Sequence, residues 1–139
     1  MRRSLVGAAG VGIAAIAITA AFGLPNVGAT ANPGTLAYYT ETVRPLLMKN
    51  CGKCHFNMSH KGGLSLETRA STMKGGRKGV VIIPGDPANS LLVRLVRHEG
   101  PANDPMPMPP KSPRMSDADI AVITQWIKAG AVMPNDAPR

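Results

Sequence analysis

The stretch Cys51-Gly52-Lys53-Cys54-His55 decides how this chain folds. It holds both cysteines of the 139-residue chain, with two residues between them and a histidine directly after the second. Near the end of a helix, cysteines at this spacing lie on neighbouring positions of one face, within reach of the two vinyl groups of one porphyrin. The C-x-x-C-H pattern therefore predicts one haem c bound covalently through Cys51 and Cys54, with His55 as the proximal ligand of its iron.

Apolar residues at helical spacing extend on both sides of this motif. Residues 36–51 predict a helix that leads into Cys51, with Pro45 either kinking it or starting its second half. Shorter helices are expected over residues 67–73 and from residue 91, the latter capped by Asn89 or Ser90. A last helix begins at Ser116, ends near Gly130 and packs Trp126 onto the first helix.

The class expected from these segments is all-α, with three to five helices and long loops around the haem. Residues 100–113 are too rich in proline to be helical, and no period-2 pattern predicts a sheet. Aromatic residues make up only 4% of the chain. A small domain with so few large rings needs a staple such as a cofactor, which agrees with a bound haem.

The N-terminus has the pattern of an export signal. Arg2 and Arg3 precede an uncharged apolar run over residues 5–24, and Ala29-Thr30-Ala31 supplies the small residues that a signal peptidase needs. We expect residues 1–31 to be a signal peptide and residues 32–139 to be one periplasmic monohaem domain. The alternative is an uncleaved membrane anchor, because the apolar run is just long enough to span a bilayer.

Three other interpretations of the cysteines compete with haem attachment. A thioredoxin-like redox pair needs a βαβ context, which the flanking sequence lacks. A zinc site would add two of His55, His60 and His98, but these histidines do not have the usual finger spacing. A simple disulfide is compatible with export. Export, a single motif and the absence of other cysteines agree best with haem.

Short motifs on both sides of the attachment site resemble, in order and spacing, the planctomycete-type cytochrome c domain of the class I cytochrome c family. The resemblance runs from about residue 42 to residue 134. The motifs are Val43-Arg44-Pro45-Leu46-Leu47, Gly62-Gly63-Leu64-Ser65-Leu66, Gly75-Gly76, Ile83-Pro84-Gly85-Asp86-Pro87, Ser90-Leu91-Leu92, Met108-Pro109-Pro110, and Trp126-Ile127 with Gly130-Ala131. The resemblance implies a class I-like fold, proximal His55 and a distal methionine from the Met-Pro-Pro loop.

The sixth position of the iron has several candidate ligands. Met106, Met108 and Met115 lie in or beside the proline-rich loop, and a proline-rich backbone holds a ligand stiffly. Met108 has proline on both sides, so we predict it as the distal ligand, ahead of Met106. His98 is a further candidate, although a histidine at a helix end is more often solvated.

The net charge is +8, and loss of Arg2 and Arg3 would leave 14 basic and 8 acidic residues, about +6. Basic residues gather in sequence around the motif, either as an ordinary solvated surface or as a rim that docks an acidic redox partner. They are Lys49, Lys53, Lys61, Lys74, Arg77 and Lys78. Arg77 or Lys78 would alternatively pair with a haem propionate. Export and the lack of interleaved aromatic residues argue against a nucleic-acid partner, and membrane contact is expected only with a retained anchor.

With histidine and methionine both bound, the iron offers no open position to a substrate. The sequence therefore predicts an exported carrier of single electrons and not an enzyme. One alternative is the cytochrome subunit of a periplasmic dehydrogenase or oxidase complex, which would co-purify with a larger catalytic chain. Another is a haem-based sensor, whose reduced iron would bind carbon monoxide readily.

Overall fold

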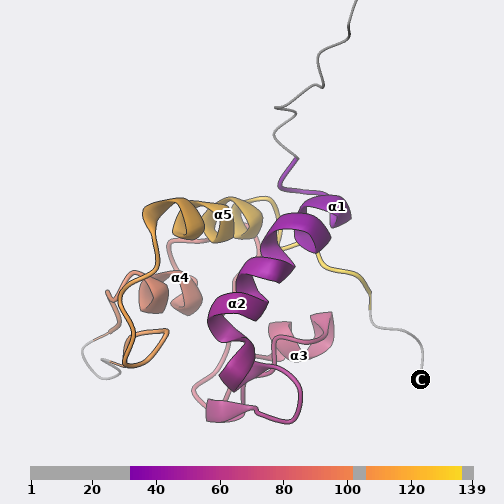
Figure 1. The fold of residues 1–139 in the computed structure, drawn as a ribbon. Helices are drawn as coiled ribbons and strands as arrows, with labels where there is room; N and C mark the ends of the chain where they lie inside the picture. Colours follow the sequence, from indigo (N-terminus) through magenta and orange to yellow (C-terminus); the bar gives the residue numbers. More distant parts are fainter. Residues whose placement is uncertain (1–31, 102–105, 136–139) are drawn as a thin grey trace, which may run out of the picture.

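The computed structural model describes residues 32–101 and 106–135, which are drawn in colour in Figure 1. Within these ranges the chain forms helices joined by loops and no strand, and its only β-type pairing is the isolated bridge between Gly76 and Gly79. The predicted all-α class is confirmed. None of the helices in the described part of the chain is long and apolar enough to cross a membrane. The expected signal segment, residues 1–31, lies outside the described residues.

The N-terminal rod consists of α1 (Leu36–Tyr38), the π-helical turn η1 (Tyr39–Val43) and α2 (Arg44–His55). The Thr35 hydroxyl accepts from the Tyr38 N–H and starts the rod. In η1 the Arg44 N–H donates to the Tyr39 carbonyl, five residues earlier. Pro45 follows at once; its ring has no N–H to donate and crowds the carbonyl four residues before it. The helix changes before Pro45, as the sequence predicts, and the change takes the form of a π turn and not of a kink or a new start.

Two short helices follow the haem-type motif. The 3-10 turn η2 (Lys61–Gly63) leads to α3 (Arg69–Lys74), which Thr68 and Ser71 begin with a reciprocal capping box. Gly75 ends α3 with φ 78°, and a side chain there would overlap the Gly79 carbonyl oxygen. This overlap explains why glycine occupies the position.

Helix α4 (Leu91–Val96) begins at the expected residue but in an unexpected way. Ser90 occupies the N-cap position without making a capping hydrogen bond. Its hydroxyl donates to the Asp86 carbonyl at 2.8 Å and accepts from the Ile83 N–H at 2.9 Å. Ser90 therefore closes the loop before α4 on itself, and this buried bond pair fixes where the helix starts.

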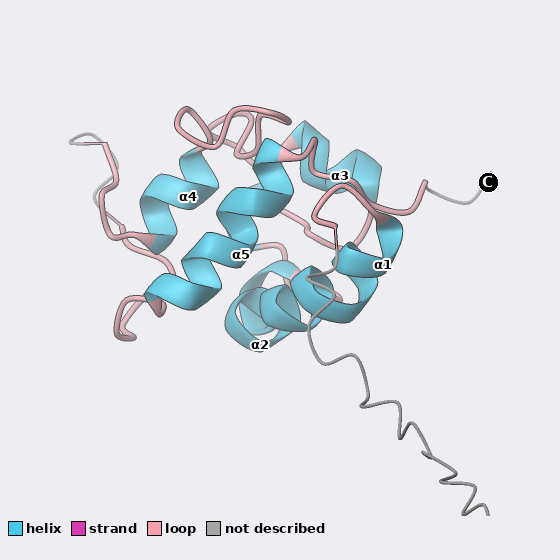
Figure 2. Cartoon of the chain, turned by 90° about the horizontal axis from the view of Figure 1, so that it is seen from above, coloured by secondary structure: helices cyan, strands magenta, loops and turns pink. Residues whose placement is uncertain are grey.

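Helix α5 (Asp117–Lys128) starts at Ser116, whose hydroxyl accepts from the Asp119 N–H at 3.1 Å. Gly130, with φ 103°, follows its last turn, as predicted. Helix α5 contacts both η1 and α4, and in Figures 1 and 2 it lies across the N-terminal rod with α4 at its side. The last helix is thereby docked onto the element that carries the cysteines.

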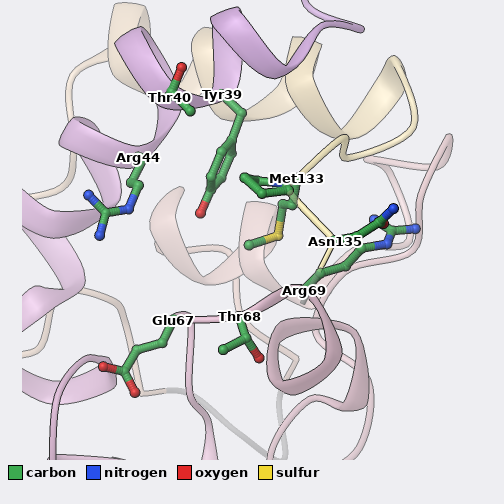
Figure 3. A pocket seen from close by; sticks show the side chains of 9 residues that line it. Tyr39, Thr40, Arg44, Glu67, Thr68, Arg69, Met133 and Asn135 are labelled. Carbon is green, nitrogen blue, oxygen red and sulfur yellow. The ribbon is translucent and has the colours of Figure 1, made fainter. Parts of the chain in front are cut away.

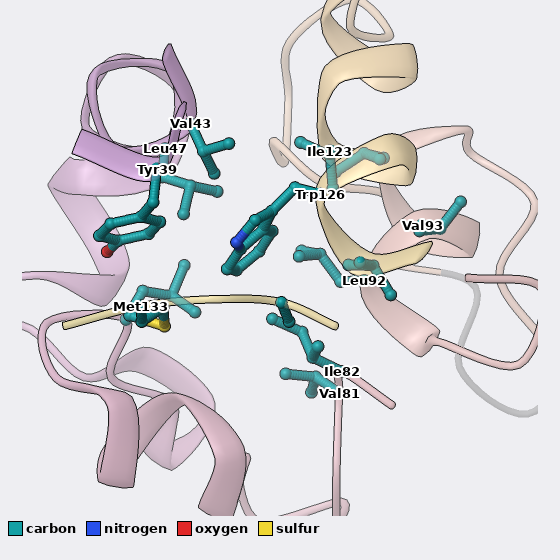
Figure 4. Close-up of a cluster of buried hydrophobic side chains, with 14 of the residues drawn as sticks. Tyr39, Val43, Leu47, Val81, Ile82, Leu92, Val93, Ile123, Trp126 and Met133 are labelled. Atoms are coloured by element: carbon teal, nitrogen blue, oxygen red, sulfur yellow. The ribbon is translucent and has the colours of Figure 1, made fainter. Parts of the chain in front are cut away.

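The centre of the core is Trp126, which is fully buried. The centroids of the Trp126 and Tyr39 rings lie 5.7 Å apart. The indole N–H of Trp126 donates to the Val132 carbonyl at 2.9 Å. Figure 4 shows Trp126 between Val43 and Leu47 of the rod on one side and Ile82 and Leu92 on the other. The predicted packing of Trp126 onto the first helix is confirmed.

Candidate haem site

The attachment motif occupies the last turn of α2, which ends at His55. Both cysteines are free and partly exposed, and Cys51 packs against the hydrophobic core. The His55 side chain is buried, with 9% of its surface exposed. A haem is a large apolar ring that is linked to the protein at one edge and ligated at its central iron. It therefore requires thiols at the edge of the core and an imidazole inside the core, as found here.

A backbone carbonyl orients the His55 ring. Nδ1 of His55 lies 3.3 Å from the Leu64 carbonyl oxygen, and the Leu66 N–H donates to the His55 carbonyl at 2.8 Å. Because a carbonyl can only accept, the proton of the neutral ring is on Nδ1, which leaves the lone pair of Nε2 available to a metal. This is the usual arrangement of an iron- or zinc-binding histidine, held by a hydrogen bond from its other nitrogen.

Burial also favours the uncharged forms of these side chains. Desolvation lowers the pKa of His55, although the bond to Leu64 opposes part of that effect. Burial, with a smaller contribution from Cys54, raises the pKa of Cys51 to about 11. Reactive redox cysteines have lowered pKa values, so the thiol of Cys51 lacks the activation that a thioredoxin-like pair needs.

The structure does not assemble the alternative metal site. Within residues 32–101 and 106–135, no three side chains of the His, Cys, Asp and Glu types gather closely enough to hold a metal ion. Instead, Nε2 of His60 lies 3.4 Å from Oε2 of Glu67. His98 follows α4 and is exposed. No disulfide joins Cys51 to Cys54. The donor set present thus fits a haem, which needs only the single imidazole on this side.

The three loop methionines have different environments. Met108 is partly buried against the core, and its N–H donates to the Leu95 carbonyl at 3.1 Å. Met106 is 58% exposed, and Met115 is 5% exposed as part of the core itself. Met108 therefore combines a fixed backbone with a side chain that is only partly covered by other residues. A distal ligand requires both properties.

The basic residues named from the sequence, Lys49, Lys53, Lys61, Lys74, Arg77 and Lys78, are all exposed. Several large apolar side chains accompany them on the surface: Met58 is 99%, Val80 54% and Met48 38% exposed. Arg77 is fixed through its backbone, because its N–H donates to the Gly62 carbonyl at 2.8 Å. These residues give the part of the chain around the motif both positive charge and apolar contact area.

Sequence reasoning did not find the two carbonyl groups that hold the candidate ligands, those of Leu64 and Leu95. A carbonyl is present at every residue, so no residue type signals its use. The role of the carbonyls emerges from the folded backbone alone.

The comparison with protein families agrees with this site. The family described as Planctomycete cytochrome C matches residues 51–112, from the first cysteine to just beyond the Met-Pro-Pro loop. No curated protein and no solved structure matches the chain. A domain of this family implies haem c and a c-type cytochrome's part in electron transfer. Residues 51–112 thus match a planctomycete-type cytochrome c domain.

Proposed function

We propose that this chain is an exported monohaem cytochrome that carries single electrons between redox partners, with its iron held between His55 and Met108. The observation that carries the proposal is the bond from Nδ1 of His55 to the Leu64 carbonyl, beside two free cysteines on the same helix end. It leaves Nε2 in the state that binds iron.

Different residues would hold the porphyrin ring and the iron of the cofactor. Cys51 and Cys54 would form thioethers that keep it attached even when the fold opens, while His55 and Met108 would bind the iron from opposite sides. The bound haem supplies a one-electron iron couple. A methionine sulfur at the sixth position raises the reduction potential relative to a second histidine and closes the iron to substrates. The protein is then a carrier and not a catalyst.

The expected partner is a protein with an acidic docking surface. The mature chain would have a charge of about +6, and the exposed lysines near the motif would attract negative charge over a Debye length of about 10 Å at 0.1 M salt. Electron transfer to such a partner should slow as salt rises, because screening reduces the steered association rate. A rate independent of salt would show that the basic residues are incidental.

Export is the second part of the proposal that needs a direct test. The pattern of residues 1–31 supports removal of that segment and release into the periplasm. The N-terminal sequence of protein made in its native host should begin at or near Asn32. Membrane-bound protein that still carries Arg2 and Arg3 would favour an anchor instead.

Visible spectroscopy of the purified holoprotein tests the ligation. The wild-type protein should be low-spin in both oxidation states, with weak long-wavelength absorption in the ferric form, and should not bind carbon monoxide when reduced. Met108→Ala should remove that absorption, lower the potential and open the reduced iron to carbon monoxide. Met106→Ala is the matched control, since this exposed side chain lies two residues away on the same loop. A large effect of Met106→Ala with a small effect of Met108→Ala would reverse the assignment.

A further inference from the structure

A cavity of about 440 Å³ lies on the N-terminal rod, separate from the cysteines and His55. The rod, the start of α3 and the segment after α5 form its walls, as Figure 3 shows. The side chains that matter for its chemistry are Tyr39, Arg44, Glu67, Thr68, Arg69 and Met133. No part of the electron-carrier proposal uses this cavity.

The Tyr39 hydroxyl points into the cavity from its upper wall (Figure 3). Tyr39 is only 2% exposed, and its ring is fixed by the contact with Trp126. No hydrogen bond joins the hydroxyl to another of the described residues. The hydroxyl is a donor held rigidly at an open cavity, where a ligand that accepts a hydrogen bond can reach it.

The charged side chains favour an anion. Arg44 and Glu67 flank one side of the cavity and Arg69 the other (Figure 3). The positive charge of Arg44 acts on the Tyr39 hydroxyl and opposes the rise that burial causes in its pKa. Glu67 is already engaged, because its carboxylate accepts from the Asn57 N–H at 2.8 Å and lies 3.4 Å from His60. Both guanidinium groups retain donors that no other described residue uses.

One wall of the cavity is apolar, while Thr40, Thr68 and Asn135 add polar side chains to the lining. Met133 and the ring of Tyr39 form the inner wall, and the Thr68 side chain lies opposite them (Figure 3). Two arginines against one glutamate leave a single excess positive charge, which suits a monoanion better than a phosphate dianion. An apolar wall next to that charge suits a short hydrocarbon tail.

We propose that this cavity binds a small monocarboxylate, whose oxygens accept from the Tyr39 hydroxyl and pair with Arg44 while its tail contacts Met133. The site connects the rod, α3 and the C-terminal segment, so an occupied cavity stabilises the fold by mass action. The inference does not depend on the haem assignment, since none of the lining residues belongs to the haem site.

Titration of the reduced holoprotein with butyrate tests the proposal. Butyrate should raise the melting temperature saturably, while the uncharged butyramide should not. In amide NMR spectra the shifts should concentrate at Thr40, Thr68 and Arg69. Shifts centred on residues 51–55, or no saturable effect at about 50 mM butyrate, would overturn the proposal.

Three single variants separate the site from general charge effects. Tyr39→Phe and Arg44→Gln should each weaken butyrate binding by roughly tenfold, because each removes a hydrogen bond to a charged group. Arg94→Gln, which removes an exposed arginine of α4 outside the cavity, should change the affinity by less than about twofold. If all three variants weakened butyrate binding equally, the binding would be a non-specific attraction of an anion to a basic protein. That result would reject the proposed site.

Discussion

Replacing Trp126 by phenylalanine tests how the last helix is held on the rod that carries the haem motif. The substitution keeps an aromatic ring against Tyr39 but removes the indole N–H that donates to the Val132 carbonyl at 2.9 Å. The segment after α5 is tied back at this point, because the Ala131 N–H donates to the Trp126 carbonyl and Met133 is part of the core. Loss of the indole bond should therefore loosen that segment as well as the core.

The cost can be estimated from the burial of the ring. Trp126 is fully buried, so the smaller ring leaves a void of about 40 Å³, which at ~24 cal/mol per Å³ costs about 1 kcal/mol. An unpaired carbonyl of Val132 costs a further ~1–2 kcal/mol. We expect the free energy of unfolding to fall by about 2–3 kcal/mol, or the melting temperature by roughly 10–20 °C for a domain of this size.

Denaturant unfolding of the holoprotein, followed by far-UV circular dichroism, measures this difference. The matched control is Tyr39→Phe, which alters the other ring of the same pair and removes only a hydroxyl without a partner among the described residues. Its effect should stay within about 0.5 kcal/mol. If the two variants cost the same, the Val132 bond contributes nothing, and the reasoning about the docking of α5 is wrong.

Three further changes have distinct outcomes. The double variant Cys51→Ser, Cys54→Ser should lose covalent haem in acid extraction, and retained haem would contradict attachment at this motif. Gly75→Ala should destabilise the fold by more than about 2 kcal/mol in thermal unfolding, because the new methyl overlaps the Gly79 carbonyl at a positive φ; a neutral result would mean that this turn adapts. Met115→Ala should cost about 2–4 kcal/mol as a core truncation yet leave the visible spectrum unchanged, unless Met115 is itself the ligand.

Much of the fold was predictable because local signals and tertiary packing agree. The capping residue Ser116, the apolar face with Trp126 and the terminating Gly130 all lie where sequence patterns place them. At Ser90 the residue type was right and its hydrogen bond was not, because a serine can cap a helix or close the preceding loop with the same hydroxyl. Only the path of the loop from Ile83 decides between these two uses.

The π turn before Pro45 was not predictable from spacing. The apolar residues at positions 39, 43 and 47 fit an ordinary helix, and a proline only requires that the helix change before it. The form of that change follows from packing, since Tyr39 and Val43 are both buried against α5. In this turn the Tyr39 ring contacts Trp126, and its hydroxyl faces the neighbouring cavity.

The two proposed iron ligands are positioned by the same device, a hydrogen bond to a main-chain carbonyl. His55 uses the Leu64 carbonyl through its ring, and Met108 uses the Leu95 carbonyl through its own N–H. The side chains of Leu64 and Leu95 contribute packing, whereas the carbonyl groups contribute direction. Ligand geometry in this domain therefore depends on the course of the backbone around Gly62-Gly63 and the end of α4. Substitutions that preserve that course should alter stability before they alter ligation.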